Sequence, residues 1–334
     1  MSSSSSNITE TIFIQQTTII FARIWCYSII ILGIIGHMSS IYVFTRPSFR
    51  SNSCIWYFFG ATISGICVVT ITIPIRLLQA GYNINLLANS LVVCKAITLL
   101  LLQWARGQSA WFTALASIDR FLCSSSSATL RSFSSLHVAR RIIPLAILVV
   151  DIIYIHVPIY FQINIRQQTC IPLPGIYQTF YGAWNLIVYS IGPPFIMLYF
   201  GIRTVQNIRQ SIRRVEINNL PIQNLQQRHK VTDRQLIQMM LFQCFIFILT
   251  ASVPSVQFIY TSVRSNIIID ALQAAKDNLF YNIAGLISLA VPCLSFYLFI
   301  LSSKLFRYEF MKLFTAKRTH QPLVITRQIT SRRN

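Results

Sequence analysis

Two charged residues lie inside apolar stretches that are long enough to cross a membrane. Arg106 interrupts residues 96–118, and Asp151 interrupts residues 142–165. An unpaired charge at the bilayer centre costs on the order of 2.5–3.5 kcal/mol, so both side chains are expected to face the protein interior or a wet cavity. There Arg106 could bind an acidic or carbonyl group of a ligand, with Gln103 one turn away. Alternatively, Arg106 and Asp151 could form a structural pair between two helices.

No constellation in the sequence predicts an enzyme or a metal centre. The histidines, including His37, His156 and His229, form no cluster with acidic residues or cysteines. The eight cysteines include no C-x-x-C pair, which is the usual spacing of cysteine metal ligands. We therefore expect no catalytic role, no metal and no cofactor.

The elements that must position these residues are apolar helices. Of 334 residues, 54% are hydrophobic and 11% are charged, whereas soluble domains have about 25% charged residues. About 20 apolar residues in a helix cross a hydrocarbon core of about 30 Å. Seven candidate spans result: 24–45, 51–75, 96–118, 142–165, the second half of 167–202, 235–263 and 278–303. The sequence therefore predicts an all-α membrane protein with a bundle of seven transmembrane helices.

The basic residues predict the orientation of this bundle. Odd-numbered connections and the C-terminal tail are rich in Lys and Arg, and even-numbered connections are poor in them. The residues before the first span, 1–18, have none. Because basic loops stay on the cytoplasmic side, we expect an extracellular tail over 1–18, a bundle over 19–303, and a cytoplasmic amphipathic helix and basic tail over 304–334.

Membrane lipid, and not nucleic acid, is the expected surrounding of the chain. The net charge is +20, but the basic residues lie between and after apolar runs, where no RNA- or DNA-binding module fits. The triplet Asn7-Ile8-Thr9 is a glycosylation sequon on the expected outer tail, so Asn7 is a candidate glycosylation site.

The end of the third predicted span carries a family motif. Its residues, Ala116 to Phe121, resemble the Asp-Arg-Tyr motif of rhodopsin-like G-protein-coupled receptors, with Phe121 in the place of Tyr. In that family the arginine closes the cytoplasmic end of helix three and contacts the G protein on activation. The resemblance implies that Asp119, Arg120 and Phe121 are coupling residues and that a heterotrimeric G protein is a partner. The alternative is an ordinary ion pair at a helix end.

Two cysteines extend this resemblance. Cys94 at the outer start of the third span and Cys170 in the next outer loop resemble the pair that forms the family's disulfide. The resemblance implies a Cys94–Cys170 disulfide, which an oxidising compartment permits. Cys94 precedes Arg120 by 26 residues, one more than in the family. We therefore expect a one-residue irregularity near the outer end of this helix.

Prolines in the later spans also match the family pattern. Pro193 and Pro194 lie at the position of the helix-five proline, and Pro254 lies at that of helix six. Pro292 lies within the seventh predicted span. Each is expected to kink its helix, with neighbouring groups bonding to the freed carbonyl.

The seventh span ends with an altered form of the family's Asn-Pro-x-x-Tyr motif. Ser295 stands for the Asn, Phe296 for the Pro and Phe299 for the Tyr. Phe306 follows Phe299 by seven residues, the family's spacing to the phenylalanine that begins an amphipathic helix. The resemblance implies such a helix on the membrane face, and its apolar side would consist of Phe306, Phe310, Met311 and Phe314.

Several family residues are replaced in this chain. His37 stands where the first helix has Asn, Gly65 stands at the second-helix Asp position, and Ser252 stands at the helix-six Trp position. We expect the family's internal sodium site to be absent. With Ser295, these departures leave open a relative that no longer couples. The stretch from Arg228 to Leu236 resembles invertebrate peptide receptors of the FMRFamide-receptor-like kind.

The resemblance implies a multi-pass plasma-membrane receptor whose ligand pocket contains Arg106, Gln103 and Leu102. A retinal receptor needs a Lys in span seven, and residues 278–303 have none. An amine receptor has an Asp where this chain has Leu102 and Gln103. A peptide or another non-amine ligand is left. The alternative class is a transporter or channel, with Arg106 and Asp151 on an ion path.

The expected cytoplasmic tail is predicted to be phosphorylated at Ser and Thr, with Thr315, Thr319, Thr326, Thr330 and Ser331 as candidates. Phosphate beside the basic tail residues can create a surface for a partner that ends signalling. Phosphoproteomics of stimulated cells should detect at least one of these sites as modified. A tail that stays unmodified during stimulation contradicts the prediction.

Overall fold

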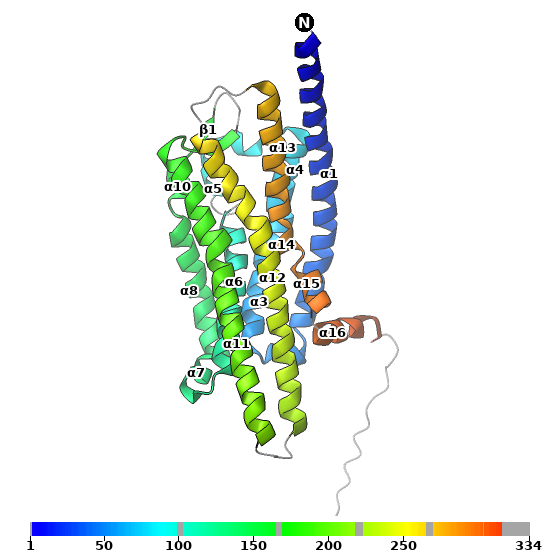
Figure 1. The fold of residues 1–334 in the computed structure, drawn as a ribbon, viewed down its shortest axis with the longest axis vertical. Helices are drawn as coiled ribbons and strands as arrows, with labels where there is room; N and C mark the ends of the chain where they lie inside the picture. Colours follow the sequence, from blue (N-terminus) through cyan, green and yellow to red (C-terminus); the bar gives the residue numbers. More distant parts are fainter. Residues whose placement is uncertain are drawn as a thin grey trace, which may run out of the picture.

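Figure 1 shows the computed structural model of the chain, a bundle of long helices. The structure describes residues 2–98, 103–164, 169–217, 223–264, 270–302 and 304–315. Within these residues the only strands are β1 (Phe161–Asn164) and β2 (Thr169–Pro172), which pair antiparallel with Ile163 opposite Cys170. The all-α prediction is confirmed, with one short hairpin in addition.

The longest helices run between the two ends of the bundle. They are α1 (Ser2–Phe44), α3 (Ser53–Cys67), α6 (Ala105–Ser124), α8 (Leu136–Tyr154), α11 (Gly192–Ile217), α12 (Gln223–Val263) and α13 (Ala271–Ser288). Shorter helices extend or connect them: α2 (Pro47–Arg50), α4 (Ile73–Tyr82), η2 (Leu86–Ala88), α5 (Leu91–Ile97), α7 (Ala128–Phe133), α9 (Val157–Tyr160), α10 (Ile176–Asn185), α14 (Ala290–Cys293), α15 (Ser295–Ser302) and α16 (Lys304–Thr315). Figure 1 shows β1 and α5 at one end, here called the disulfide end, and α7 at the other, here called the Arg120 end.

Five helical segments are long and apolar enough to cross a membrane. They are Asn7–Phe44, Ser53–Tyr82, Leu136–Tyr160, Ile176–Ser211 and Leu241–Val263. A sixth results if Ala271–Cys293 and Ser295–Leu301, which are bent by 59°, form one span. The third predicted span is missing from this set because α6 is polar and residues 99–102 lie outside the described part. The helices are thus those of a multi-pass membrane protein, and the count of seven stays a prediction.

Two of these segments contain a π-helical turn just before a proline. They are η1 (Val68–Thr72), before Pro74, and η4 (Leu186–Ile191), before Pro193. The Gly192 N–H bonds to the Ile187 carbonyl, five residues back. A Cβ atom on residue 192 would lie 2.8 Å from that oxygen, so the turn requires glycine. Because proline lacks an N–H and its ring crowds the preceding turn, the wider π turn accommodates it within a continuous helix.

The outer part of the third predicted span is irregular in the same way. Thr98, Gln103 and Trp104 have π-helical backbone on either side of residues 99–102, which lie outside the described part. A π turn holds about one residue more than an α turn. This accounts for the additional residue expected between Cys94 and Arg120.

Pro254 and Pro292 have different effects on their helices. α12 continues through Pro254, and the Ser190 hydroxyl of the neighbouring helix donates to the Ala251 carbonyl there at 2.8 Å. That hydroxyl replaces hydrogen bonding that is weakened at the proline. After Pro292 the helix breaks at Leu294, and the 59° bend follows. The predicted kink is therefore present at Pro292, whereas α12 stays unbroken.

Phenylalanine rings form the core at the Arg120 end, and α16 contributes to it. Phe306 is 1% exposed, and its ring centre lies 5.6 Å from that of Phe296. Phe310 packs on Phe296 at 5.1 Å, while Met311 is exposed. Figure 1 shows α16 lying across the direction of the bundle helices. The predicted amphipathic helix is present, and the side chain of Phe314 and the tail beyond residue 315 lie outside the described part.

His37 fills the space that Gly65 leaves open. It is 1% exposed, and both of its ring nitrogens are buried without a hydrogen-bond partner among the described residues. A Cβ atom on residue 65 would lie 2.4 Å from His37 Cε1 and 3.0 Å from the Pro292 carbonyl oxygen. The residues at positions 37 and 65 are therefore coupled through one contact.

Gly65→Ala is predicted to lose most of its effect when His37 is also replaced. Overpacking reduces the free energy of unfolding by about 1–3 kcal/mol. Replacing glycine by alanine within a helix increases it by ~1 kcal/mol. With His37→Ala the ring is gone and the Pro292 contact alone remains. Thermal unfolding of the four proteins in detergent measures the coupling, expected at about 1 kcal/mol or more. Equal destabilisation in both backgrounds would show that His37 is not the obstacle.

Candidate functional site

A cavity of about 790 Å³ lies at the disulfide end, which is within the range of about 300–1,000 Å³ for small-ligand sites. Helices α1, α4, α6, α10, α12 and α13 and the hairpin form its wall. Among the described lining residues are Arg76, Arg106 and Gln103, and none is acidic. Two of the three predicted pocket residues thus line this cavity, and Leu102 lies outside the described residues.

Arg106 points into the cavity from the start of α6. Its Nη2 donates to the Ser288 hydroxyl at 3.3 Å, and its guanidinium carbon lies 4.7 Å from the centre of the Tyr189 ring. Its Nε is buried without a partner, and no ion pair to it is found among the described residues. A neutral hydroxyl and a ring face compensate only part of the lost hydration of a buried cation. The expectation that Arg106 faces the interior is confirmed.

Asp151 does not face the interior, so the expectation that it does is wrong, and the alternative pair with Arg106 is not formed. Asp151 is exposed on α8, and its carboxylate accepts a hydrogen bond from the Trp104 indole. Val150 and Tyr154 are buried. Because successive helix residues point about 100° apart, the residue after Val150 turns away from the bundle. Asp151 therefore contributes nothing to the cavity or to an ion path through it.

Gln103 belongs to an aromatic part of the cavity wall. Its amide donates to the Tyr181 hydroxyl. Tyr181 is 1% exposed, and its ring centre lies 5.2 Å from that of Phe161 in β1 and 5.4 Å from that of Phe258 in α12. The hairpin, α10 and α12 thus meet at one tyrosine, and Gln103 connects it to the helix of Arg106.

Arg76 is the cavity residue that the sequence analysis missed. In α4 its Nη1 donates to Gln79 at 3.1 Å and its Nη2 to the Tyr281 hydroxyl at 3.3 Å. It follows an apolar stretch, and its position there favoured a loop. No sequence signal identifies it, because Tyr281 lies 205 residues further along the chain.

The N-terminal part of α1 forms another part of the wall. Gln15 and Thr18 line the cavity. Glu10 pairs with Lys276 of α13 at 2.9 Å, which holds this part of α1 against the bundle. Asn7 is exposed one turn earlier, so an attached glycan would have room. The 1–18 tail is therefore helical where described, and it continues into the first span.

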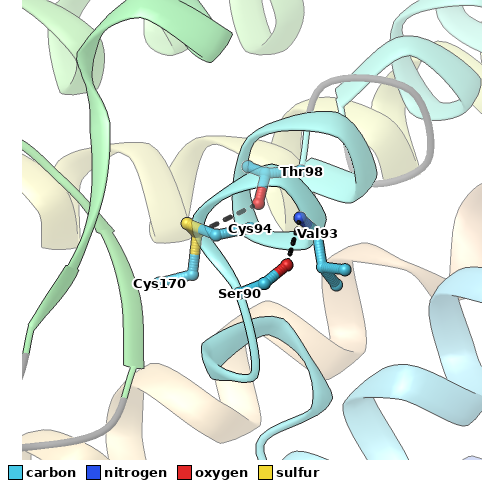
Figure 2. The surroundings of a disulfide bond; sticks show 5 residues. All are labelled: Ser90, Val93, Cys94, Thr98 and Cys170. Carbon is cyan, nitrogen blue, oxygen red and sulfur yellow. Dashed lines mark hydrogen bonds between the residues drawn. A yellow bond between two sulfur atoms is a disulfide. The ribbon is translucent and has the colours of Figure 1, made fainter.

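A disulfide joins Cys94 of α5 to Cys170 of β2, with 5.6 Å between the Cα atoms. Figure 2 shows its surroundings, where Thr98 lies 3.4 Å from the Cys170 sulfur and Ser90 caps α5 through the Val93 N–H. Because Cys170 and its neighbours in β2 line the cavity, the disulfide fixes the hairpin over it. The implied pairing is present.

At the other end, Asp119 and Arg120 lie in a closed polar network. They are 4% and 3% exposed and form an ion pair at 3.0 Å. The Asp119 carboxylate also accepts from Ser53 at 2.9 Å and from Ser134 at 3.0 Å. Arg120 donates to Asn52, whose side chain also caps α3. The network ties α6 to the start of α3 and to the residue after α7, so Arg120 is covered in this structure.

The remaining motif residues line the same end. Phe121 packs on Phe200 of α11 with 5.3 Å between ring centres. The Ser295 hydroxyl donates to the Pro292 carbonyl at 3.4 Å, across the break between α14 and α15. Phe299 is buried, and its ring centre lies 5.7 Å from that of Phe306.

Helix α6 carries an arginine of the cavity and an arginine of the polar network. Arg106 in the cavity and Arg120 in the polar network are fourteen residues apart in α6, a rise of about 21 Å at about 1.5 Å per residue. The network holds its own acid, whereas the described part of the cavity wall has none. The geometry therefore combines a ligand-sized, cationic cavity with a closed contact at the opposite end.

The disulfide is predicted to protect its two cysteines from thiol labelling, while Cys123 reacts. Cys123 is an exposed cysteine that is not part of the disulfide, and so it provides an internal control in the same chain. A maleimide applied to the detergent-purified protein should label Cys123 before reduction, and Cys94 and Cys170 only after reduction. Peptide mass spectrometry reads all three sites, and labelling of Cys94 or Cys170 without reductant would refute the bond.

The chain was also compared with known proteins. No protein-family model matches it, and a search of curated proteins finds no match either. A functional assignment must therefore start from the cavity, the polar network and the motifs described above.

Proposed function

We propose that the chain is a plasma-membrane receptor of seven transmembrane helices, similar to rhodopsin-like G-protein-coupled receptors. It transmits binding of an extracellular ligand to a heterotrimeric G protein. In this proposal the N-terminus is extracellular and the C-terminus cytoplasmic. The supporting observation is that α6 carries Arg106 in a ligand-sized cavity and Arg120 in a closed polar network at the other end.

In this proposal the third span consists of α5 and α6 together. Its polarity agrees with a central place in the bundle, because a helix surrounded by other helices needs no apolar surface toward lipid. Most residues of α6 are buried in the bundle, including Gln108, Thr113 and Ser117. The three charged residues of α6 face the cavity or the polar network, where neighbouring side chains bind them.

Signalling in the proposed receptor is a population shift between a closed and an open form of the Arg120 end. Each hydrogen bond to a charged group contributes about 1.5–3 kcal/mol, so the network stabilises the closed form. Moving a two-state equilibrium from 1:99 to 99:1 requires a ligand that binds the open form about 5.5 kcal/mol more tightly. A ligand that fills the cavity and interacts with Arg106 could supply such a difference.

A route from the cavity to α12 supports this mechanism. Arg106 lies over the ring of Tyr189, and that ring packs edge-on against Phe247 of α12 at 5.0 Å. Next to it, Ser190 bonds to the Ala251 carbonyl and lies 3.0 Å from the Ser255 hydroxyl. Movement of the Arg106 side chain toward a ligand would change the packing of Tyr189 and thereby the position of α12. In the proposal α12 then opens the face that holds Arg120.

Arg120→Ala is predicted to reduce ligand-stimulated nucleotide exchange at least about tenfold, while ligand still binds at the cell surface. Ser134→Ala removes one hydrogen bond to Asp119 and should raise basal exchange. Arg131→Ala is the matched control, because Arg131 lies at the same end and bonds to the Ser125 and Ser126 carbonyls outside the network. Ligands come from a screen of secreted peptides and small metabolites with G-protein dissociation as the readout.

The same experiments separate the alternatives. Unchanged exchange in Arg120→Ala contradicts the coupling role. Ligand binding without exchange in the wild-type chain indicates a relative that no longer couples. Ligand-dependent solute or ion flux in liposomes that contain the purified chain indicates a transporter or channel.

A further inference from the structure

The cavity is cationic without an internal counter-ion. Its described wall contains two arginines, Arg76 and Arg106, while its other polar residues are amides and hydroxyls. Both guanidinium groups have neutral partners: Gln79 and the Tyr281 hydroxyl for Arg76, and Ser288 and the Tyr189 ring for Arg106. Charges that are withdrawn from water are costly unless an opposite charge compensates them. The wall thus offers two positive charges and no negative one.

The acidic residues described at this end are already engaged elsewhere. Glu10 pairs with Lys276 at 2.9 Å, and Asp277 lies 3.7 Å from Arg264. Asp270 accepts the Ala271 N–H at the start of α13 at 2.8 Å. None of these carboxylates lines the cavity. A counter-ion for the two arginines therefore has to come from the bound molecule.

The two guanidinium groups contact one face of α13 on either side of a glycine. Arg76 bonds to Tyr281 and Arg106 to Ser288, positions that lie about 10 Å apart along the helix at about 1.5 Å per residue. Gly285 lies between them on the same face and lines the cavity. A Cβ atom there would lie 3.4 Å from Arg76 Nη2, so the absent side chain leaves the backbone open beside the guanidinium.

We propose that the cavity binds an organic acid whose carboxylate docks against Gly285 between Arg76 and Arg106. A carboxylate accepts two parallel hydrogen bonds from a guanidinium and provides the missing negative charge. The body of the ligand lies toward Tyr181, Phe161 and Phe258, whose rings line the same cavity. The inference rests on the proposed receptor function, because it names the ligand class of that site.

Two sources supply this chemistry, a small aryl carboxylic acid and the free C-terminal carboxylate of a peptide. Each is tested with a matched neutral amide. The first pair is 3-phenylpropionate and 3-phenylpropionamide, and the second is Gly-Gly-Phe as free acid and as C-terminal amide. Within a pair the shape is nearly the same and the charge differs. The readout is the melting temperature of the full chain in lipid nanodiscs, because a ligand that binds the folded state raises it.

We expect at least one acid to raise the melting temperature with about tenfold or higher apparent affinity than its amide, a difference of about 1.4 kcal/mol. Arg76→Gln and Arg106→Gln should each reduce that affinity at least about tenfold. Arg264→Gln is the matched control, an arginine at the same end that does not line the cavity. The acid with the larger preference over its amide identifies the source.

Gly285→Leu keeps both arginines and fills the gap between them, so it tests the docking position if an arginine variant fails to fold. It should abolish the acid-specific shift. Equal responses to acid and amide, no shift with either acid, or an acid preference that survives all three cavity variants overturns the proposal.

Binding and signalling can fail independently in this design. If an acid binds and its binding depends on the two arginines, but no nucleotide exchange follows, the receptor function is contradicted. The proposal of an acid-binding site is then still supported. If an amine or neutral ligand stimulates nucleotide exchange, and Arg76→Gln and Arg106→Gln do not change that exchange, the acid-binding site is contradicted. The receptor function is then still supported.

Discussion

Polar groups that a chain carries into apolar surroundings are stabilised by partners within the protein, and the main contacts of this structure follow from that constraint. The Trp25 indole donates to the Leu286 carbonyl at 3.0 Å, and Arg23 donates to the Gly81 carbonyl at 2.8 Å. Both bonds join helices that are distant in sequence. The π turn before Pro193 follows the same rule, since it keeps backbone groups bonded where a proline would interrupt an α-helix. Helix contacts and helix irregularities therefore have one cause.

The arginines of α6 meet this constraint in opposite ways. Arg120 donates to the Asp119 carboxylate and to the Asn52 amide oxygen, so its charge is compensated within the chain. Two serine hydroxyls from other segments donate in turn to Asp119. Arg106 has a serine hydroxyl and a tyrosine ring. A charge that is compensated within the chain stabilises the arrangement around it. A charge without a counter-ion is stabilised when a ligand provides one. The two ends of one helix therefore differ in how their charges are compensated.

The sequence contained enough information for most of the helices and for the sites that rest on spacing. Cys94 and Cys170 pair, and Arg106 faces inward four turns from Arg120. The inward orientation predicted for Asp151 was wrong because the free-energy cost of burying a charge does not determine the direction in which a side chain points. The exposed carboxylate instead bonds to the Trp104 indole. The face of α8 that packs inward depends on its neighbours.

Arg76 could not be placed from the sequence because its partner is Tyr281, 205 residues away. Hydropathy assigns the end of an apolar stretch to the membrane surface, whereas the contact of the Arg76 side chain with Tyr281 of α13 places it in the cavity wall. The hairpin could not be predicted either, because strands of four residues are too short to show a clear alternation of apolar and polar residues. In both cases the missing information is a contact between distant segments.

The length of α1 has a mechanical consequence. One unbroken helix reaches from Glu10, paired with α13 beside the cavity mouth, to Phe44, whose ring packs on Phe306 of α16 at 5.7 Å. These residues lie about 51 Å apart along the helix at about 1.5 Å per residue. This continuous helix, held near both ends, provides a connection between the cavity wall and α16 that is separate from α6. Like α6, helix α1 therefore joins the disulfide end to the Arg120 end of the bundle.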